Sequence, residues 1–269
     1  MPNSTINEGA IVRVTDPATF SFAGAWFSGG NALGDWFCVS SNTMQSNGFM
    51  VIGHGDSGSL SSLIDFGIGT SGSVVAIVQD ILLNAPGSAV DYVAPYLVPI
   101  NIPSGAQLFA RGRNSSASSA GVRFQIQQIS HLYRGGLSQA ITYGVVPTSS
   151  AGTLVDPGTT VNTWGAWVTV ASATINAIRH MLISFSQRGN TTLLSTNMLS
   201  QFAVGPVGQE KLLFGTLNLR LRSNDNSFKP NMFNIPINVP AGTRVACRAQ
   251  ATTADANDRL FWTSFVGFN

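Results

Sequence analysis

Charged residues are scarce in this chain of 269 residues, because Asp, Glu, Lys and Arg together make up only 10% of it. An average soluble protein has roughly 25%. The 14 basic and 12 acidic residues are spread along the sequence and give a net charge of +2. Without a concentrated positive field, no nucleic-acid partner is expected. Lysine occurs only at Lys211 and Lys229, and the arginines that remain suit interfaces, which favours a role in assembly.

Long apolar runs are also missing. No stretch approaches the roughly 20 consecutive apolar residues that cross a bilayer, so no membrane is expected as a partner. The first residues lack the basic and apolar regions of a signal peptide, so secretion is not expected either.

Cysteine and histidine are too few and too scattered to indicate a metal site. Cys38 and Cys247 lie far apart in the sequence and are predicted to be buried free thiols. No group of residues has the spacing of zinc ligands. The acidic cluster at 255–258 is predicted to be a solvated loop tip rather than a calcium loop. No metal and no cofactor is therefore expected.

Residues 53–59, Gly-His-Gly-Asp-Ser-Gly-Ser, are similar to the segment around the nucleophile of chymotrypsin-like proteases. In that arrangement the base comes from far upstream, and no histidine precedes His54. His131 and His180 lie downstream, and the segment follows an apolar run, as turns do. We therefore predict a turn, no catalytic residue and no enzymatic activity.

What the sequence does contain is an internal repeat. Pro-Ile-Asn-Ile-Pro-Ser-Gly at 99–105 returns as Pro-Ile-Asn-Val-Pro-Ala-Gly at 236–242, and Arg111 and Arg248 follow at the same distance. Further matches, in the same order, join 31–36 with 162–167, 69–72 with 205–208, and 49–52 with 180–183. The last of these places His180 opposite Phe49. A repeat of this kind defines the architecture before any single motif does.

Short segments rich in Val, Ile, Phe and Thr, separated by Gly, Pro, Asn and Ser, predict strands joined by turns. The predicted fold class is all-β, with tandem related β-sandwich domains of jelly-roll type. The predicted boundaries are an N-terminal arm at 1–19, a first sandwich at 20–132, a linker at 133–156 and a second sandwich at 157–269.

The repeated aromatic and arginine positions are the candidate interaction residues. Trp36 and Trp167 are equivalent and followed by apolar alternation, which favours shared core packing over sugar binding. Trp26, Trp164 and Trp262 offer further flat faces to sugars. Arg111 and Arg248 are either paired structural arginines at the sandwich rim or contacts to a neighbouring subunit.

Residues 63–73, Leu-Ile-Asp-Phe-Gly-Ile-Gly-Thr-Ser-Gly-Ser, and residues 99–111 resemble segments of jelly-roll-like head and tail accessory proteins of tailed bacteriophages. The resemblance covers most of the first unit and the latter half of the second. There the Asp-Phe-Gly portion is lost, with Val204-Gly205 near its place, so no role of Asp65 is carried over.

This resemblance implies a non-enzymatic virion structural protein. The form expected first is a capsid decoration or cement protein that binds the head lattice, and the alternative is a tail or baseplate protein that binds a receptor or glycan. It also implies a homo-trimer or other homo-oligomer, with the major capsid protein or tail proteins of the same virion as partners. The expected location is the virion, assembled in the host cytoplasm.

Overall fold

The computed structural model describes residues 11–13, 27–28, 31–40, 43, 45–55, 62–83, 96–115, 122–129, 137–187, 196–222, 227–229, 232–253 and 260–269. In the first half the strands are β1 (Ile11–Arg13), β2 (Phe27–Ser28), β3 (Phe37–Ser40), β4 (Gly48–Gly55), β5 (Ser62–Thr70), β6 (Ser73–Leu83), β7 (Tyr96–Val98), β8 (Gln107–Asn114) and β9 (Val122–Ile129).

The second half begins with β10 (Ala140–Tyr143), β11 (Val145–Val146), the 3-10 turn η2 (Pro147–Ser149), β12 (Ala151–Val155), β13 (Val168–Ala171) and β14 (Ile178–Gln187). It continues with β15 (Thr196–Val204), β16 (Lys211–Leu212), β17 (Leu217–Arg222), β18 (Ser227–Lys229), β19 (Met232–Val239), β20 (Val245–Ala251) and β21 (Phe261–Phe268). Within the described residues, no helix is long and apolar enough to cross a membrane.

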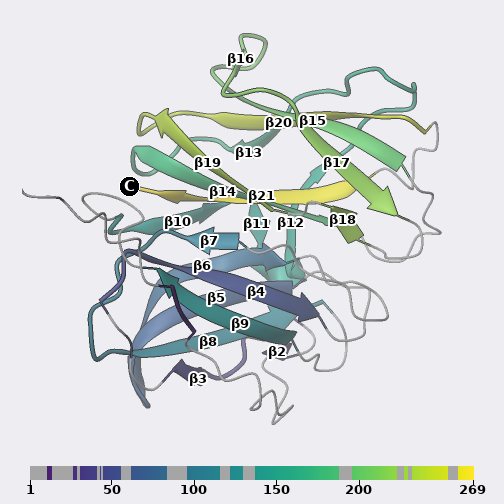
Figure 1. The fold of residues 1–269 in the computed structure, drawn as a ribbon. Helices are drawn as coiled ribbons and strands as arrows, with labels where there is room; N and C mark the ends of the chain where they lie inside the picture. The colour runs from purple at the N-terminus through teal and green to yellow at the C-terminus, as the bar shows by residue number, and fades with distance from the viewer. Residues whose placement is uncertain are drawn as a thin grey trace, which may run out of the picture.

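The first half folds as a sandwich of two sheets, drawn in purple to teal in Figure 1. One sheet has the strand order β1-β9-β4-β7, and the other has the order β2-β8-β5-β6, with β3 also paired to β8. Apolar side chains alternate along the strands and meet between the sheets. At the centre the Phe49 ring from β4 meets the Phe66 ring from β5 edge-on, with ring centroids 5.1 Å apart.

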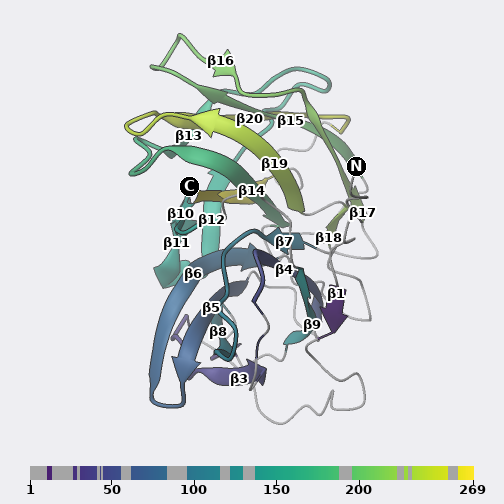
Figure 2. The same cartoon turned by 60° about the vertical axis from the view of Figure 1, so that its left-hand side comes forward.

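The second half repeats this plan in teal through green to yellow (Figures 1 and 2). Its inner sheet has the order β11-β12-β21-β14-β19, with β10 also on β21, and its outer sheet has the order β13-β20-β15-β17-β18, with β16 on β15. Phe185 of β14 contacts the rings of Phe202, Phe233 and Phe261 at centroid distances of 6.3, 5.8 and 5.8 Å. These rings form the centre of a separate apolar core.

The two halves have the same connectivity. β3, β4, β5, β7, β8 and β9 correspond to β13, β14, β15, β19, β20 and β21, and β6 corresponds to β16 together with β17. In each half, both sheets contain strands from the beginning and from the end of the unit, which is the connectivity of a jelly roll. The predicted all-β fold with tandem jelly-roll-like sandwiches is confirmed.

Strand register shows the repeat residue by residue. Asp65 pairs with Arg111 between β5 and β8, and Gln201 pairs with Arg248 between β15 and β20. The counterpart of Asp65-Phe66-Gly67 is therefore 201–203, Gln-Phe-Ala. The sequence comparison placed it near Val204-Gly205, which is wrong, and the core phenylalanine is in fact kept.

The predicted equivalence of His180 and Phe49 is also wrong, by one residue. Phe49 pairs with Val98, and Met181 pairs with Ile235, which stands at the same place before the repeated Pro-Ile-Asn segment. A bulge in β14 between 178 and 180 shifts the register there. Because a one-residue shift reverses the faces of a strand, Met181 points into its own sandwich and His180 points out of it.

The predicted arm and the predicted linker both contribute strands. Of residues 1–19 the structure describes only β1, in which Val12 pairs with Gln128 of β9. In the segment 133–156, β10 takes the corresponding place in the second half, where Ile141 pairs with Gly267 of β21. Residues 11–13 thus belong to a sheet of the first half, and the predicted linker contains the strands β10, β11 and β12. Short edge strands bury few side chains, so their sequences carry little sign of the repeat. The remaining boundaries stay predictions.

The two sandwiches share an apolar seam. Leu182 of β14 and Val266 and Phe268 of β21 point away from their own core and join the core cluster of the first sandwich. On the other side of the seam, the Cδ2 atom of Leu82 lies 2.9 Å from the position that a Cβ on Gly152 would take. The candidate residues lie on the sheet of β2, β8, β5 and β6 with β3 in the first sandwich and on the outer sheet of the second.

Candidate functional site: the outer sheet faces

The outward face of the sheet with β5 and β8 carries the first cluster of predicted residues. Arg111 points away from the core, and its guanidinium carbon lies 4.2 Å from the centre of the Trp36 ring. Its Nε donates a 2.9 Å hydrogen bond to Oδ2 of Asp65. The other carboxylate oxygen, Oδ1, accepts a 2.8 Å bond from the backbone N–H of Asp80. Arg111 is therefore held between an aromatic face and a carboxylate.

Asp65 is only 2% exposed, and its burial is the main cause of a pKa above the usual value. The Asp80 carboxylate also raises the pKa, while the Asp80 N–H and Arg111 oppose both effects. Asp80 itself is paired with Arg113. The cluster thus alternates Asp and Arg side chains across β5, β6 and β8.

The second sandwich builds a related cluster without an acid. The Arg248 guanidinium lies 4.4 Å from the Trp167 ring centre and 4.8 Å from that of Trp164. Its Nε and Nη2 donate bonds of 3.0 and 2.8 Å to Oε1 of Gln201. The Gln201 amide nitrogen in turn donates a 3.1 Å bond to Oγ1 of Thr216. A neutral amide replaces Asp65 at the equivalent position.

The structure brings together the four candidate residues in equivalent pairs, Arg111 with Trp36 and Arg248 with Trp167. The expectation that these tryptophans pack in the shared cores is wrong, since both are half-buried on outer faces and cover arginines. The arginines are bound by their own chain. Of the two alternatives for Arg111 and Arg248, these contacts fit that of paired structural arginines.

The repeated segments 31–36 and 162–167 owe their likeness to backbone geometry. Asn31 and Asn162 take positive φ values of 63° and 55°, a region that Asn tolerates better than most residues. The Asn31 N–H bonds to the Asn114 carbonyl, and the Asn162 N–H to the Ala251 carbonyl, at 2.9 and 2.8 Å. Because the backbone of each segment is held at its first residue, the tryptophan at its end lies against the arginine of the same sandwich.

A pair of buried threonines completes the repeat and was missed in the sequence. The Thr43 hydroxyl donates to the Pro103 carbonyl, and the Thr174 hydroxyl donates to the Pro240 carbonyl, both at 2.8 Å. Both side chains are 2% exposed. The threonine carbonyls accept the N–H of the glycine in each Pro-x-Gly turn at 2.7 Å. The only sequence signal was a threonine at matching distance after each tryptophan.

The cysteines differ in exposure. Cys247 is buried as predicted, and burial raises the pKa of its thiol to about 12. Cys38 is exposed, so the prediction that it is buried is wrong. Both thiols are free. Cys38 lies on the short edge strand β3, where the general tendency of free cysteines to be buried, on which the prediction rested, does not hold.

His180 faces the seam rather than a cleft. Its Nε2 lies 3.2 Å from Oδ1 of Asn234, and its ring meets that of Phe268 at a centroid distance of 6.0 Å. Burial lowers the pKa of the imidazole, which favours its neutral form.

The protease-like segment 53–59 falls mostly outside the described residues; only the backbone of 53–55 is described, as the end of β4. His131, Trp26 and the acidic cluster at 255–258 also lie outside them. Across the described ranges, no group of three or more His, Cys, Asp and Glu side chains has an arrangement that could hold a metal ion.

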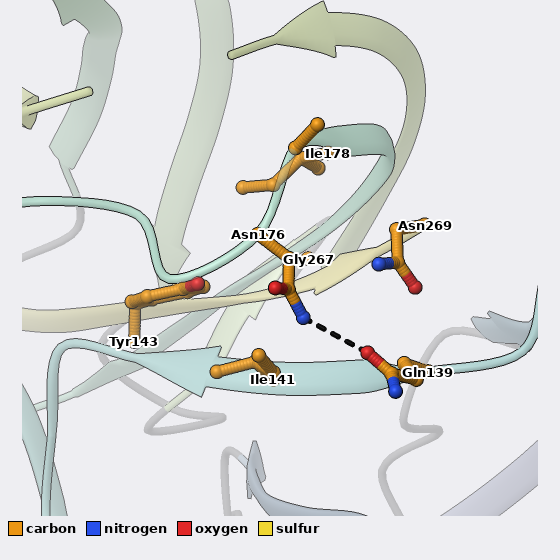
Figure 3. A pocket seen from close by; sticks show the side chains of 8 residues that line it. Gln139, Ile141, Tyr143, Asn176, Ile178, Gly267 and Asn269 are labelled. Carbon is orange, nitrogen blue, oxygen red and sulfur yellow. Dashed lines mark hydrogen bonds between the residues drawn. The ribbon is translucent and has the colours of Figure 1, made fainter. Parts of the chain in front are cut away.

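Hollows lined by described residues lie on the second sandwich. The first lies at its rim, where Ile141, Tyr143 and Ile178 surround Gly267 and where Asn176 donates a 2.9 Å bond to Gln139 (Figure 3). Its side chains leave no room for a ligand.

The second hollow is open, has a volume of about 300 Å³ and lies on the outward face of the outer sheet. Its lining includes Asn162, Asn197, Leu199, Asn218, Gln250 and Thr252.

The fold defines the class of this protein as a tandem jelly-roll sandwich. No protein-family model matches the chain, and no curated protein matches its sequence. Among solved structures, PNGF-II aligns over 97% of this chain at 9% identity and a TM-score of 0.39, and this chain covers 66% of that one, just under two thirds of its length.

The STIV MCP, a viral capsid protein, aligns over 97% of this chain and 96% of its own, at 10% identity and a TM-score of 0.34. The CBM22-1-CBM22-2 tandem domain of Paenibacillus barcinonensis Xyn10C aligns over 84% and 80%, at 12% identity and a TM-score of 0.28. At TM-scores below 0.5 these similarities carry no argument about function.

Proposed function

We propose that this chain is a non-enzymatic structural protein of a virus particle, and specifically a phage capsid decoration protein that binds and stabilises the head lattice. The observation that carries the proposal is the exposure of apolar side chains at equivalent hairpins of both sandwiches. Val75, just after the β5–β6 turn, is 67% exposed. Val207 in the β15–β16 turn and Leu212 beyond it are 79% and 51% exposed.

Large apolar side chains exposed on the corresponding hairpins of two related units favour contact with a repeating protein surface. The low charge of the chain supports the same proposal, since few charged groups would lose water at such a contact. The partners we propose are further copies of the chain, as a trimer or other homo-oligomer, and the major capsid protein of the same virion. The proposed location is the virion.

A non-enzymatic role is supported by how the reactive side chains are used. Arg111, Asp65 and Arg248 bond to one another or to neighbouring side chains in rigid clusters. Cys247 and His180 are buried among apolar groups. Each of these groups has a structural partner in place of a substrate.

The test is to measure the occupancy of purified particles by quantitative gel densitometry. Val75→Ser combined with Val207→Ser should lower the number of copies per particle by about tenfold, because two apolar contacts are lost. Ile175→Ser, a change at a 69% exposed residue before β14, is the matched control and should leave occupancy unchanged. Full occupancy of the double variant would overturn the proposal, and so would a wild-type copy number of only a few per particle.

A second candidate function is a tail or baseplate protein that binds a receptor or glycan. The open, amide-lined hollow on the second sandwich favours it. A copy number of a few per particle would support this candidate over the first.

A further inference from the structure

The open hollow lies on the second sandwich, and the strands that form it have counterparts in the first. In the second sandwich Asn218, Leu199 and Gln250 stand side by side on β17, β15 and β20. All three point to the outward face, because their neighbours Met198, Leu219 and Ala251 point into the core.

The equivalent row in the first sandwich is Leu82, Leu63 and Arg113 on β6, β5 and β8. Leu82 is fully buried against Gly152 of the second sandwich, and Arg113 is paired with Asp80. In the first sandwich this row thus contains a side chain that packs in the seam and an arginine that forms an ion pair. The second sandwich has neutral polar side chains there.

The lining of the hollow is a ring of amides around an aliphatic floor. Leu199 lies in the middle of the row, between Asn218 and Gln250. Asn162 stands on the far side of β20, where its N–H bonds to Ala251. Asn197 lies beside Thr252, whose hydroxyl accepts the Asn197 N–H at 3.2 Å.

The amide groups of this ring are available to a ligand. Across the described ranges, no side-chain amide of Asn162, Asn197, Asn218 or Gln250 has a hydrogen-bond partner. Gln201, on the same face of the sheet, has both ends of its amide bonded. The four amides provide donors and acceptors together and no charge.

We infer that this hollow binds an uncharged saccharide through Asn162, Asn197, Asn218 and Gln250. Adjacent hydroxyl groups of a sugar can each donate to and accept from an amide, and the C–H face of the ring can rest on Leu199. A volume of about 300 Å³ is at the small end of ligand sites and fits a mono- or disaccharide.

This inference rests on the second candidate function and is independent of the hairpin contacts proposed for the capsid. Particle occupancy and glycan binding are measured separately, so the failure of one leaves the other standing. A shallow open site predicts weak binding to a single sugar, which several copies in one particle would strengthen.

The test uses the whole chain and two kinds of probe. An array of neutral and acidic oligosaccharides identifies the bound class, and saturation-transfer NMR with the methyl glycosides of glucose, galactose, mannose and N-acetylglucosamine measures binding directly. We expect binding to one or more neutral glycans. Binding to acidic glycans alone, or to no glycan, would overturn the inference.

Variants locate the site. Asn218→Leu introduces the residue that the first sandwich has at this place and fills the hollow; Gln250→Ala removes one amide. Each should weaken binding by about tenfold or more, as expected when a polar group of the ligand loses its partner. Asn238→Leu, at an exposed position on β19, is the matched control and should bind like the wild type. Unchanged binding by both hollow variants would place the glycan elsewhere and overturn the inference. Thermal unfolding checks that each variant is folded.

Discussion

The two sandwiches share a scaffold and differ in what their outer faces are used for. Both hold an arginine against a tryptophan on the outer sheet, at the same register. In the first sandwich the arginine is paired with an acid, and the sheet edge is covered by the second sandwich. In the second, the arginine is paired with an amide, and Asn218, the counterpart of the buried Leu82, is exposed. The two sandwiches therefore share their strand framework and their arginine–tryptophan pairs, and they differ in the side chains that the outward face presents.

The largest effect is expected where the two sandwiches meet. Phe268→Ala should lower the free energy of unfolding by about 3–5 kcal/mol, because Phe268 is fully buried in the seam. Chemical denaturation followed by tryptophan fluorescence and by circular dichroism should give one coincident transition for the wild type. Phe37→Ala, at a phenylalanine that is 38% exposed, is the control and should cost less than about 1 kcal/mol. Similar costs for both changes would argue against a shared seam.

The equivalent arginines Arg111 and Arg248 should contribute different amounts to the free energy of unfolding. Arg111→Ala leaves the buried Asp65 carboxylate without its ion partner and should cost about 3 kcal/mol. Arg248→Ala leaves only a neutral amide and should cost about 1 kcal/mol. Denaturation curves of the two variants measure the difference directly. Equal losses would mean that the tryptophan contacts, common to both clusters, dominate.

Replacing the acid by an amide should make the first cluster resemble the second. Because burial raises the pKa of Asp65, ionisation of this carboxyl is less favourable in the folded than in the unfolded chain. Its contribution is thus most favourable at low pH and is lost as the pH rises from about 4, the unfolded value, through the folded pKa.

The free energy of unfolding of Asp65→Asn, relative to wild type, should therefore increase between acidic and neutral pH. Asp35→Asn, which removes an exposed carboxylate outside the cluster, controls for the change in net charge. A difference that is flat with pH, or that falls, would contradict the stated direction.

The smallest effect is expected where the halves are most alike. Thr43→Val and Thr174→Val each remove one hydroxyl bond to a proline carbonyl and should each cost about 1 kcal/mol. The double variant should show the sum, since the two sites lie in different sandwiches. Thr159→Val, at an exposed threonine, is the control. A clear inequality between the two single variants would show that the turns are not equivalent.

The fold class and the repeat could be predicted because both depend on local patterns. Turn residues, strand alternation and the string Pro-Ile-Asn recur in the sequence itself. The place of His180 could not be predicted, since a single bulge in β14 changes the register without a sequence signal. β1 and β10 were not predicted either, because strands of only three and four residues show too little alternation to be recognised in the sequence.

The candidate residues were found, but their roles required the structure. Trp36 and Trp167 were recognised as equivalent, while their contact with the arginines depends on strands that are far apart in the sequence. The hollow was not predicted at all. Its row of Asn218, Leu199 and Gln250 comes from three separate segments and exists only once β17, β15 and β20 are paired in register.

The position of β21 has a consequence for how the chain folds during synthesis. This strand, the last of the second sandwich, pairs with β10, β12 and β14 and supplies Val266 and Phe268 to the seam. The strands described for the first sandwich are all present once residue 129 has left the ribosome. The second sandwich and the seam are complete only after residues 261–268 are made, so the apolar side chains of the first sandwich that pack in the seam remain uncovered until then.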